Sequence, residues 1–303
     1  MLLLGAVVLA AAGGDAFLKS ILGAAWHLRM PATVVATTLA AFATSSPEFT
    51  VSTVAALAGR PEIGLGDALG SNVVNIALVF GLALLFGAVQ TSRAVFEYDF
   101  YLALGVPALT CVFLLDGRIE HGEALALLAI FALWLAWTVR NAVRLRPTHP
   151  AVPANAPSMP MTIIVGVIGL GALVAAGRLF VTGASGMATA WNLDPFVIGA
   201  VLVAVGTSMP ELVTVVFSRL RRHDEVGIGT LIGSNLFNGL AIVGVAGSIR
   251  PIAAPLNEVA LALVCGVLAL LLLLPDRSGL ILRSRGLMLL MLYVAFVWAA
   301  VVA

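Results

Sequence analysis

Apolar runs of membrane-spanning length recur about ten times along the 303 residues, separated by short polar stretches. A transmembrane helix needs about 20 consecutive, mainly apolar residues. The runs are continuous rather than alternating, which favours helices over the strands of a transmembrane barrel. They predict helices at residues 2–26, 31–57, 66–87, 97–115, 121–143, 161–190, 195–219, 228–247, 254–274 and 286–302. The expected fold is therefore an all-α membrane protein with ten transmembrane helices.

The composition agrees with lipid as the main solvent and partner. Hydrophobic residues make up 61% of the chain and charged residues 10%, whereas soluble domains average about 25% charged residues. The net charge of +1 offers no basic stripe for phosphates, so nucleic acid is not an expected partner. Cys111 and Cys265 lie in separate apolar runs and predict neither a disulfide nor a metal site.

Two motifs occur twice at one spacing. ATSSPE at 43–48 returns as GTSMPE at 206–211, and GLGDALGSNVVN at 64–75 returns as GIGTLIGSNLFN at 227–238. One constant difference in residue number, without gaps, relates both pairs, and we call it the repeat offset. Each copy holds five predicted helices, an odd number, so the second copy must enter the membrane from the opposite side. This predicts an inverted-topology repeat, which many secondary transporters share.

The stretch at 144–160 is rich in proline and polar residues and is expected to be a linker. It separates a first five-helix repeat at 1–143 from a second at 161–303. One set of loops holds most of the arginines, and the opposite set holds only Arg60, Arg118 and Arg250. Because arginine-rich loops stay in the cytoplasm, the linker is predicted to be cytoplasmic and both termini outside. The lysine-poor composition favours the plasma (inner) membrane of a prokaryote.

Glu48 and Glu211 lie at equivalent positions deep in their apolar runs. A charged residue at the bilayer centre costs about 2.5–3.5 kcal/mol on insertion scales. The presence of two such glutamates therefore requires an explanation. One interpretation is that each glutamate caps or packs a helix. The favoured interpretation is that the two carboxylates meet at the repeat interface and hold a cation.

A proline precedes each glutamate. Inside a helix, proline leaves the carbonyl four residues earlier unpaired, here the carbonyls of Ala43 and Gly206. Such carbonyls are tolerated at membrane depth only inside protein or beside water, and they are good cation ligands. The same turns add the hydroxyls of Thr44, Ser45, Thr207 and Ser208. The alternative is that these hydroxyls bond back to the preceding helical turn.

The second motif combines glycines with serine and asparagine. Its glycines form small-residue faces that let helix backbones approach closely. Ser71 and Asn75 are four residues apart, as are Ser234 and Asn238, so each pair shares one helical face.

Other polar residues in the runs are expected to be structural. Asn72 and its counterpart Asn235 point about 100° away from those faces and are expected to satisfy backbone groups near a helix start. Asp67, also near a predicted helix start, is expected to be a cap rather than a ligand. Asp15 and Lys19 are four apart and are expected to pair as an interfacial set, with a gating role as the alternative.

Every candidate ligand is an oxygen atom. Ca2+ takes 6–8 oxygen ligands, and Na+ is also a hard ion. The four histidines fall in loops or at helix ends, which argues against zinc or copper. Two carboxylates give the site a charge of −2, which one Ca2+ or two monovalent ions would balance. Ion-loaded forms should then cross the membrane most readily, which makes obligatory exchange natural. No resident cofactor is expected, and a monomer suffices.

The paired segments resemble the two alpha repeats of the cation/calcium exchanger superfamily, which includes the sodium/calcium exchangers. The alpha-1 motif is at 41–75 and the alpha-2 motif at 204–238, and the ten-helix layout matches along nearly the whole chain. The resemblance implies that the second, third, seventh and eighth helices form an ion-binding core. The first and sixth helices would slide across this core to alternate access.

The resemblance also implies a set of metal ligands and a transport activity. Carried onto this sequence, the ligands are Glu48, Glu211, Thr44, Ser45, Thr207, Ser208, Asn75, Asn238, Ser71, Ser234 and the carbonyls of Ala41 and Ala204. The implied activity is exchange of Ca2+ for Na+. Sodium-coupled prokaryotic members often carry aspartate at the place of Asn238, and its absence puts a three-sodium stoichiometry in doubt. A second departure is Ala43, where glycine is usual.

Three other activities are weighed against this one. The nearest is a Ca2+/H+ exchanger, or an exchanger of another divalent cation, on the same scaffold. The Thr-Ser pair before each proline resembles the sodium-coupled branch, since the proton-coupled branch tends to carry asparagine there. A passive cation channel is disfavoured because deep, fully liganded sites trap ions. An enzyme is not expected, because the sequence has no HExxH motif and HGEAL at 121–125 lacks a second ligand.

Overall fold

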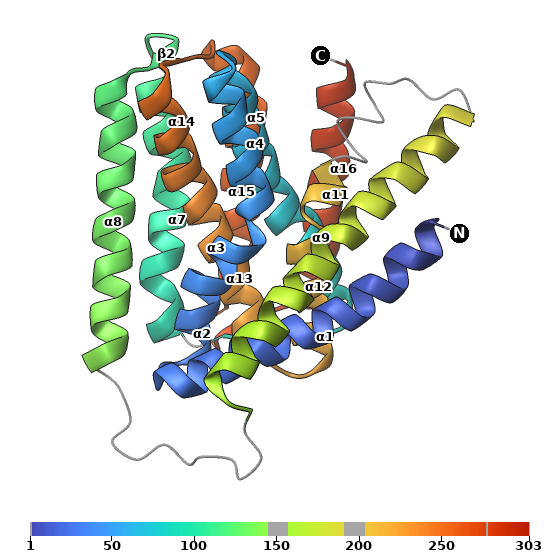
Figure 1. The fold of residues 1–303 in the computed structure, drawn as a ribbon. Helices are drawn as coiled ribbons and strands as arrows, with labels where there is room; N and C mark the ends of the chain where they lie inside the picture. Colours follow the sequence, from blue (N-terminus) through green and yellow to red (C-terminus); the bar gives the residue numbers. More distant parts are fainter. Residues whose placement is uncertain (1, 92, 145–156, 191–203, 277, 303) are drawn as a thin grey trace.

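The computed structural model describes residues 2–91, 93–144, 157–190, 204–276 and 278–302, and these are mostly helical (Figure 1). The first half contains α1 (Leu2–Leu28), α2 (Ala32–Val35), η1 (Ala36–Ala40), α3 (Ala41–Thr44), α4 (Ser46–Leu57), α5 (Pro61–Val73), η2 (Val74–Phe80), α6 (Gly81–Leu85), α7 (Arg93–Phe113) and α8 (His121–Arg144). The second half contains α9 (Met159–Ala190), α11 (Ala204–Thr207), α12 (Met209–Leu220), α13 (Asp224–Leu236), η4 (Phe237–Ile242), α14 (Val243–Ile249), α15 (Leu256–Leu272) and α16 (Arg283–Val302). The η elements are π-helical segments within longer helices.

Among the described residues, six helices are long and apolar enough to cross a membrane, and three shorter apolar helices accompany them. Most of the predicted linker, residues 145–156, lies outside the described residues, and so does the start of the predicted helix at 195–219. The predicted helix at 31–57 is wrong as a continuous helix, because it breaks at Ser45. The described part of 195–219 breaks in the same way at Ser208.

Two predicted helix starts are also displaced. The helix predicted from residue 66 begins at Pro61, and the one predicted from 228 begins at Asp224. Proline at the first position of a helix is favourable, because its missing N–H would have had no partner there. Asp67 therefore lies in the interior of α5 and is not a cap. Asn72 is likewise far from the helix start, contrary to expectation.

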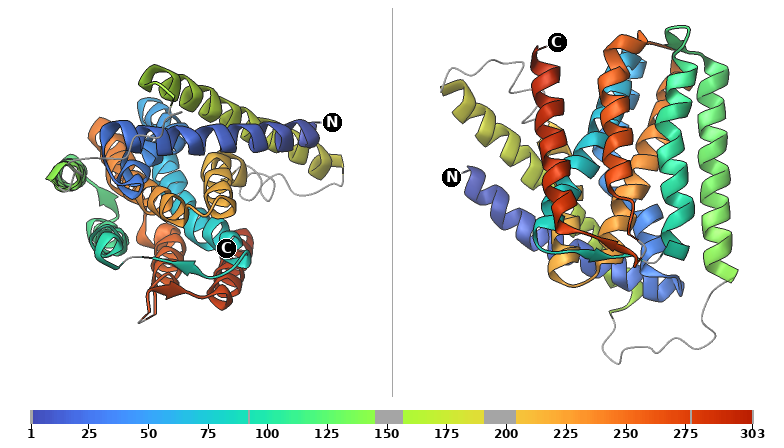
Figure 2. Two further views of the ribbon diagram at one scale, coloured as in Figure 1. Left: turned by 90° about the horizontal axis from the view of Figure 1, so that it is seen from below. Right: turned by 180° about the vertical axis from the view of Figure 1, so that it is seen from behind.

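Two short antiparallel strand pairs connect the halves of the chain within the described residues. They are β1 (Val89–Gln90) with β4 (Leu280–Ile281), and β2 (Arg118–Ile119) with β3 (Ile252–Ala253). Each pair joins a strand of the first half to a strand of the second. The β2–β3 pair lies at the end of the molecule that holds the α4–α5 turn (Figure 1), and β1–β4 lies at the opposite end (Figure 2).

The helices α1 and α9 run side by side, inclined across one face of the bundle (Figure 2). They cross at glycines: a Cβ on Gly13 would lie 2.9 Å from the Gly169 carbonyl oxygen, and one on Gly169 would lie 2.7 Å from the Phe17 amide nitrogen. Only residues without a side chain allow this approach. Leu173 and Phe17 belong to a separate, smaller apolar cluster, distinct from the large core formed mainly by the other helices.

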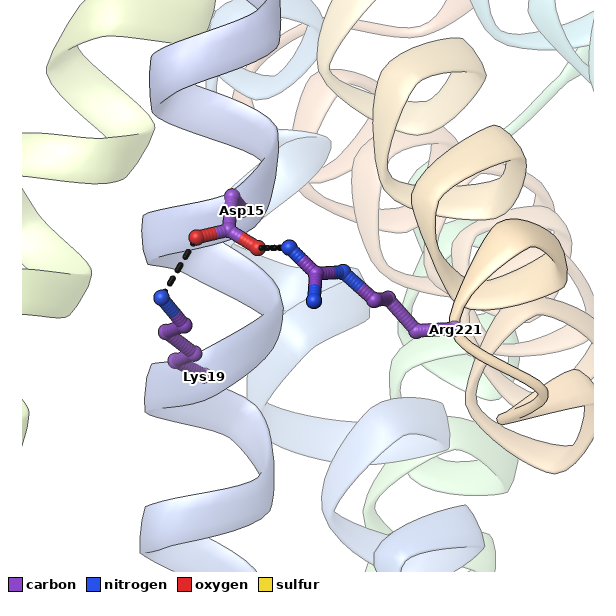
Figure 3. Close-up of polar contacts among 3 residues, drawn as sticks. All are labelled: Asp15, Lys19 and Arg221. Atoms are coloured by element: carbon purple, nitrogen blue, oxygen red, sulfur yellow. Dashed lines mark hydrogen bonds and ion pairs between the residues drawn. The ribbon is translucent and has the colours of Figure 1, made fainter.

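An ion-pair cluster joins α1 to the end of α12 (Figure 3). Asp15 binds Lys19 at 2.6 Å, which confirms the predicted pair, and its second oxygen binds Arg221 at 2.5 Å. The residue that the repeat offset relates to Asp15 is Arg178, on α9. The partner of Asp15 outside α1 is thus Arg221, which directly follows α12, and the repeat pattern did not indicate this residue.

Candidate cation-binding site

Two helix breaks build the centre of the molecule. Ser45 separates α3 from α4 with φ −84° and ψ 9°, and Ser208 separates α11 from α12 with φ −83° and ψ 11°. The repeat offset relates these two serines, so the repeated sequence produces the same local backbone in both halves. Each break precedes a proline and then a glutamate.

The prolines act differently from expectation. Pro47 and Pro210 lie in the first turn of α4 and α12, where a missing N–H removes no helical hydrogen bond. The prediction that the Ala43 carbonyl is unpaired is wrong, since this oxygen accepts a hydrogen bond from the Ser46 hydroxyl at 2.7 Å. The polar lining of the site therefore comes mainly from side chains.

Glu48 and Glu211 are each only 1% exposed. Ser45 Oγ and Ser234 Oγ donate to Glu211 Oε1 at 3.3 and 3.4 Å. Thr44 Oγ1 lies 3.4 Å from Ser234 Oγ. Serine and threonine hydroxyls from both halves thus converge on the Glu211 carboxylate.

The glutamates have no protein cation beside them in the described part of the chain, where neither forms a salt bridge. The second carboxylate oxygen, Oε2, of each is buried without a hydrogen-bond partner among the described residues. A buried charge without a partner is strongly unfavourable. The arrangement therefore suits a mobile cation that supplies the missing charge.

Four asparagines form a reciprocal network between the halves. Asn72 Nδ2 donates to the Asn235 carbonyl at 3.3 Å, and Asn235 Nδ2 donates to the Asn72 carbonyl at 3.2 Å. Asn75 Nδ2 donates to Asn235 Oδ1 at 3.2 Å, and Asn238 Nδ2 donates to Asn72 Oδ1 at 3.1 Å. Asn72 and Asn235 do satisfy backbone carbonyls, as expected, but across the repeat interface and not at a helix start.

This network leaves some acceptor atoms without a hydrogen-bond partner. The Oδ1 atoms of Asn75 and Asn238 are buried and have no hydrogen-bond partner in the described structure, and the same holds for Ser208 Oγ. Asn75 lies in η2 and Asn238 in η4, and π-helical turns are frequent at functional sites. The apolar pattern of these segments did not indicate the wider turns.

The remaining predicted ligands are distributed unevenly. Ser71 is buried at 3% exposure, and no hydrogen bond joins it to either glutamate among the described residues. The carbonyl of Ala41 already accepts from Ser45 N at 3.0 Å and from Thr44 Oγ1 at 3.3 Å. Ala204 lies in α11. Thr207 is half-buried and lines a cavity of about 580 Å3.

Sequence reasoning did not single out two further hydroxyls. Ser52 and Thr214 lie one turn beyond Glu48 and Glu211, and their oxygens are buried without hydrogen-bond partners among the described residues. Their spacing of four and three residues from the glutamates could have indicated them. The described residues contain no group of three or more His, Cys, Asp and Glu side chains suited to a metal, so the oxygens around the two carboxylates are otherwise neutral.

The 580 Å3 cavity lies beside the two helix breaks. Ser46, Pro47, Thr207 and Pro210, all next to the helix breaks, line one side of it. Residues of α9, including Arg178, line the other side. The cavity thus lies between the inclined helix and the broken helices.

Comparison with known proteins gives a consistent result. The sodium/calcium exchanger protein family matches residues 1–140 and 161–302. The putative antiporter CaxA of Alkalimonas amylolytica is 32% identical over 244 residues, which are 78% of this chain and 76% of that protein. The sodium/calcium exchanger MaX1 of Methanosarcina acetivorans is 28% identical and covers 98% of this chain, with 96% of its own length matched.

The fold has a counterpart among solved structures. The sodium-calcium exchanger NCX_Mj, in a crystal soaked without Na+ and Ca2+, superposes with a TM-score of 0.82 and 28% sequence identity. The match covers 97% of this chain and 96% of that one. These neighbours are ion exchangers, so the chain is a multi-pass membrane protein, an antiporter and not an enzyme. On this fold and this match, the chain belongs to the sodium/calcium exchanger family.

Proposed function

We propose that this protein is a secondary active antiporter that exchanges Ca2+ for Na+ by alternating access. Both cations are transported substrates, and no resident cofactor takes part. The observation that carries the proposal is a set of buried oxygens without partners among the described residues. They come from both halves: Glu48 Oε2, Glu211 Oε2, Ser208 Oγ, Asn75 Oδ1 and Asn238 Oδ1. Oxygen ligands of this kind suit Ca2+, which takes 6–8 oxygens from protein and water together.

The charge of the site supports exchange rather than one-way passage. Two carboxylates without a protein counter-charge carry −2, which one Ca2+ or two Na+ would neutralise. An empty site would place two unbalanced negative charges inside the membrane, which is costly. The empty carrier should therefore reorient slowly, and each transported ion should be exchanged for another.

We assign the cations to the twelve residues identified from the motifs. The glutamates provide charge, Asn75 and Asn238 provide amide oxygens, and Thr44, Ser45, Thr207, Ser208, Ser71 and Ser234 provide hydroxyls. The carbonyls of Ala41 and Ala204 complete the set. The convergence of side chains from both halves on Glu211 supports this assignment.

The proposed architecture has ten transmembrane helices in two inverted five-helix repeats, at 1–143 and 161–303. The equal offset of the breaks at Ser45 and Ser208, and the strand pairs at opposite ends of the molecule, support this arrangement. We place the 144–160 linker in the cytoplasm and both termini outside a prokaryotic plasma membrane. The distribution of arginines supports this orientation.

Alternating access would come from α1 and α9. These helices pack mainly against each other and cross at glycines, so they can move as a pair across the broken helices. The cavity beside the site is lined by the part of α4 that follows the break and by the later part of α9. Both parts lead toward the α4–α5 turn, so the proposed orientation makes this an outward-facing state.

The test is 45Ca2+ uptake into liposomes that contain the purified protein, driven by an outward Na+ gradient at clamped pH. Uptake should require the gradient and should be lost in Glu211→Gln. It should persist in Glu62→Gln, which changes an exposed glutamate at the start of α5. Uptake driven by an imposed pH gradient and indifferent to Na+ would replace this proposal with Ca2+/H+ exchange. Uptake that needs no counter-ion would indicate a channel.

A further inference from the structure

Asp67 is a further acidic residue in the interior of a membrane-spanning helix, and nothing in the site described above uses it. It lies on α5, six residues after Pro61, or about 9 Å along the helix axis. Its Oδ2 atom is buried and has no hydrogen-bond partner among the described residues. A carboxylate in this position needs either a proton or a cation.

A separate cavity of about 200 Å3 lies beside this carboxylate. One wall is α5, with Gly66, Asp67, Gly70 and Ser71, and the facing wall is α16, with Tyr293 and Phe296 among its residues. A Cβ on Gly66 or Gly70 would meet no atom within 4 Å. The two glycines thus leave room beside Asp67, enough for a cation that keeps part of its water shell.

The second half has no such feature at the equivalent position. The repeat offset relates Asp67 to Thr230, which is fully buried, and its hydroxyl donates to the Val226 carbonyl of its own helix at 2.9 Å. A threonine satisfied in this way needs no ligand. The acidic side chain therefore belongs to the first half alone.

We propose that Asp67 and this cavity bind one monovalent alkali cation, with Na+ as its physiological occupant, at a site separate from the glutamate pair. One carboxylate balances one positive charge, whereas a divalent ion would keep an excess charge among the apolar side chains of α16. The site also has few protein oxygens, which disfavours Ca2+ with its demand for 6–8. Ser71 and Asn75 follow Asp67 at four-residue intervals, which places Asp67 about one and two helical turns from two of the ligands proposed for the central site.

Such a site would add a third negative charge to the two glutamates. The choice of Na+ as occupant rests on the proposed Na+ coupling. The existence of the site does not, because it depends only on Asp67 and its cavity.

The test is equilibrium binding of 22Na+ to the purified full-length protein. In the variant E48Q/E211Q, which lacks the central carboxylates, about one equivalent of Na+ should still bind. Adding D67N should abolish this binding. Adding D99N instead should leave it, because Asp99 already accepts a hydrogen bond from Trp134 Nε1 at 2.7 Å. Gly70→Leu fills the cavity without changing charge and should weaken Na+ binding at least tenfold, even if D67N fails to fold.

Excess K+ should compete for this Na+, and Ca2+ at equal ionic strength should not. The inference is overturned if E48Q/E211Q binds no Na+, if its binding survives D67N, or if Ca2+ displaces Na+ more strongly than K+ does. These results do not depend on transport. Loss of the Asp67 site would leave Na+-driven Ca2+ uptake through the glutamates to be judged separately.

Discussion

The two halves of this protein share a backbone at the site but treat their glutamates differently. Ser45 of the first half donates to Glu211 of the second, whereas its counterpart Ser208 has no partner among the described residues and makes no such bond to Glu48. Ser234 also donates to Glu211. The Glu211 carboxylate thus accepts hydrogen bonds from two serines, whereas Ser208 donates none to Glu48, although both glutamates are equally buried.

This difference shows that a duplicated sequence can fix equivalent positions without fixing equivalent contacts. The reciprocal asparagines follow the two-fold relation closely, while the glutamates and Asp67 do not, and the α4–α5 and α12–α13 turns share a positive φ but place different residues there. Contacts inside the symmetric network should therefore respond equally to mutation in either half. Contacts outside it should respond unequally.

The largest effect is expected from the glutamates. Glu48→Gln and Glu211→Gln should each reduce Na+-driven 45Ca2+ uptake at least about tenfold, since losing more than about 1.4 kcal/mol of cation binding has this effect. Glu211→Gln should also change the unfolding temperature more than Glu48→Gln does, because only Glu211 is held by Ser45 and Ser234. Normal uptake by either variant would contradict equal participation in cation binding.

The asparagine network should give large and symmetric effects. Asn72→Ala and Asn235→Ala each leave a buried carbonyl and an amide without a partner, so each should lower the free energy of unfolding by about 1–3 kcal/mol. Apparent Ca2+ affinity should fall in both, because Asn238 and Asn75 lose the acceptors that hold them. Thr110→Val is the control, since that hydroxyl bonds only within its own helix. If one of the two substitutions left stability and Ca2+ affinity unchanged while the other lowered them, the result would argue against the two-fold relation here.

Smaller, opposite effects are expected at the two turns. Gly59 has φ +83°, and its counterpart Arg222 has φ +61°, a conformation that costs a residue with a side chain about 1–2 kcal/mol. Gly59→Ala should lower the unfolding temperature, because its Cβ would also meet Arg250. Arg222→Gly should raise the unfolding temperature slightly. The free energy of unfolding should rise by less than about 1 kcal/mol, because the greater unfolded-state entropy of glycine offsets part of the gain. If both substitutions shifted the unfolding temperature in the same direction, the result would contradict this explanation.

The smallest effect is expected from the ion pair between α1 and α12. The side chain of Arg221 is 56% exposed and that of Asp15 is 26% exposed, so their coupling should be at most about 1 kcal/mol. A double-mutant cycle with Asp15→Asn and Arg221→Gln should change Ca2+ uptake less than about fivefold and should weaken at high salt. A much larger coupling that resists salt would mean that this pair controls the movement of α1.

Several elements of the fold could be predicted closely. The boundaries of α1, α8, α9 and α16 lie within about three residues of the predicted ones, because apolar length and flanking polar residues define a membrane helix well. The breaks at Ser45 and Ser208 were missed. A proline after a run of apolar residues has the same appearance in sequence whether it kinks a helix or begins a new one.

The sequence alone determined the membrane class and the repeat offset, since these depend on hydrophobic length and on residue types that recur. The set of twelve candidate ligands followed from the resemblance of the repeated motifs to the exchanger family. Only the tertiary structure decided which ligand oxygens remain without partners, which glutamate is held, and where Asp67 faces a cavity. Those outcomes depend on contacts between residues far apart in the chain, such as Ser45 with Glu211 and Asn72 with Asn235. No local pattern specifies a contact whose partner lies in the other half.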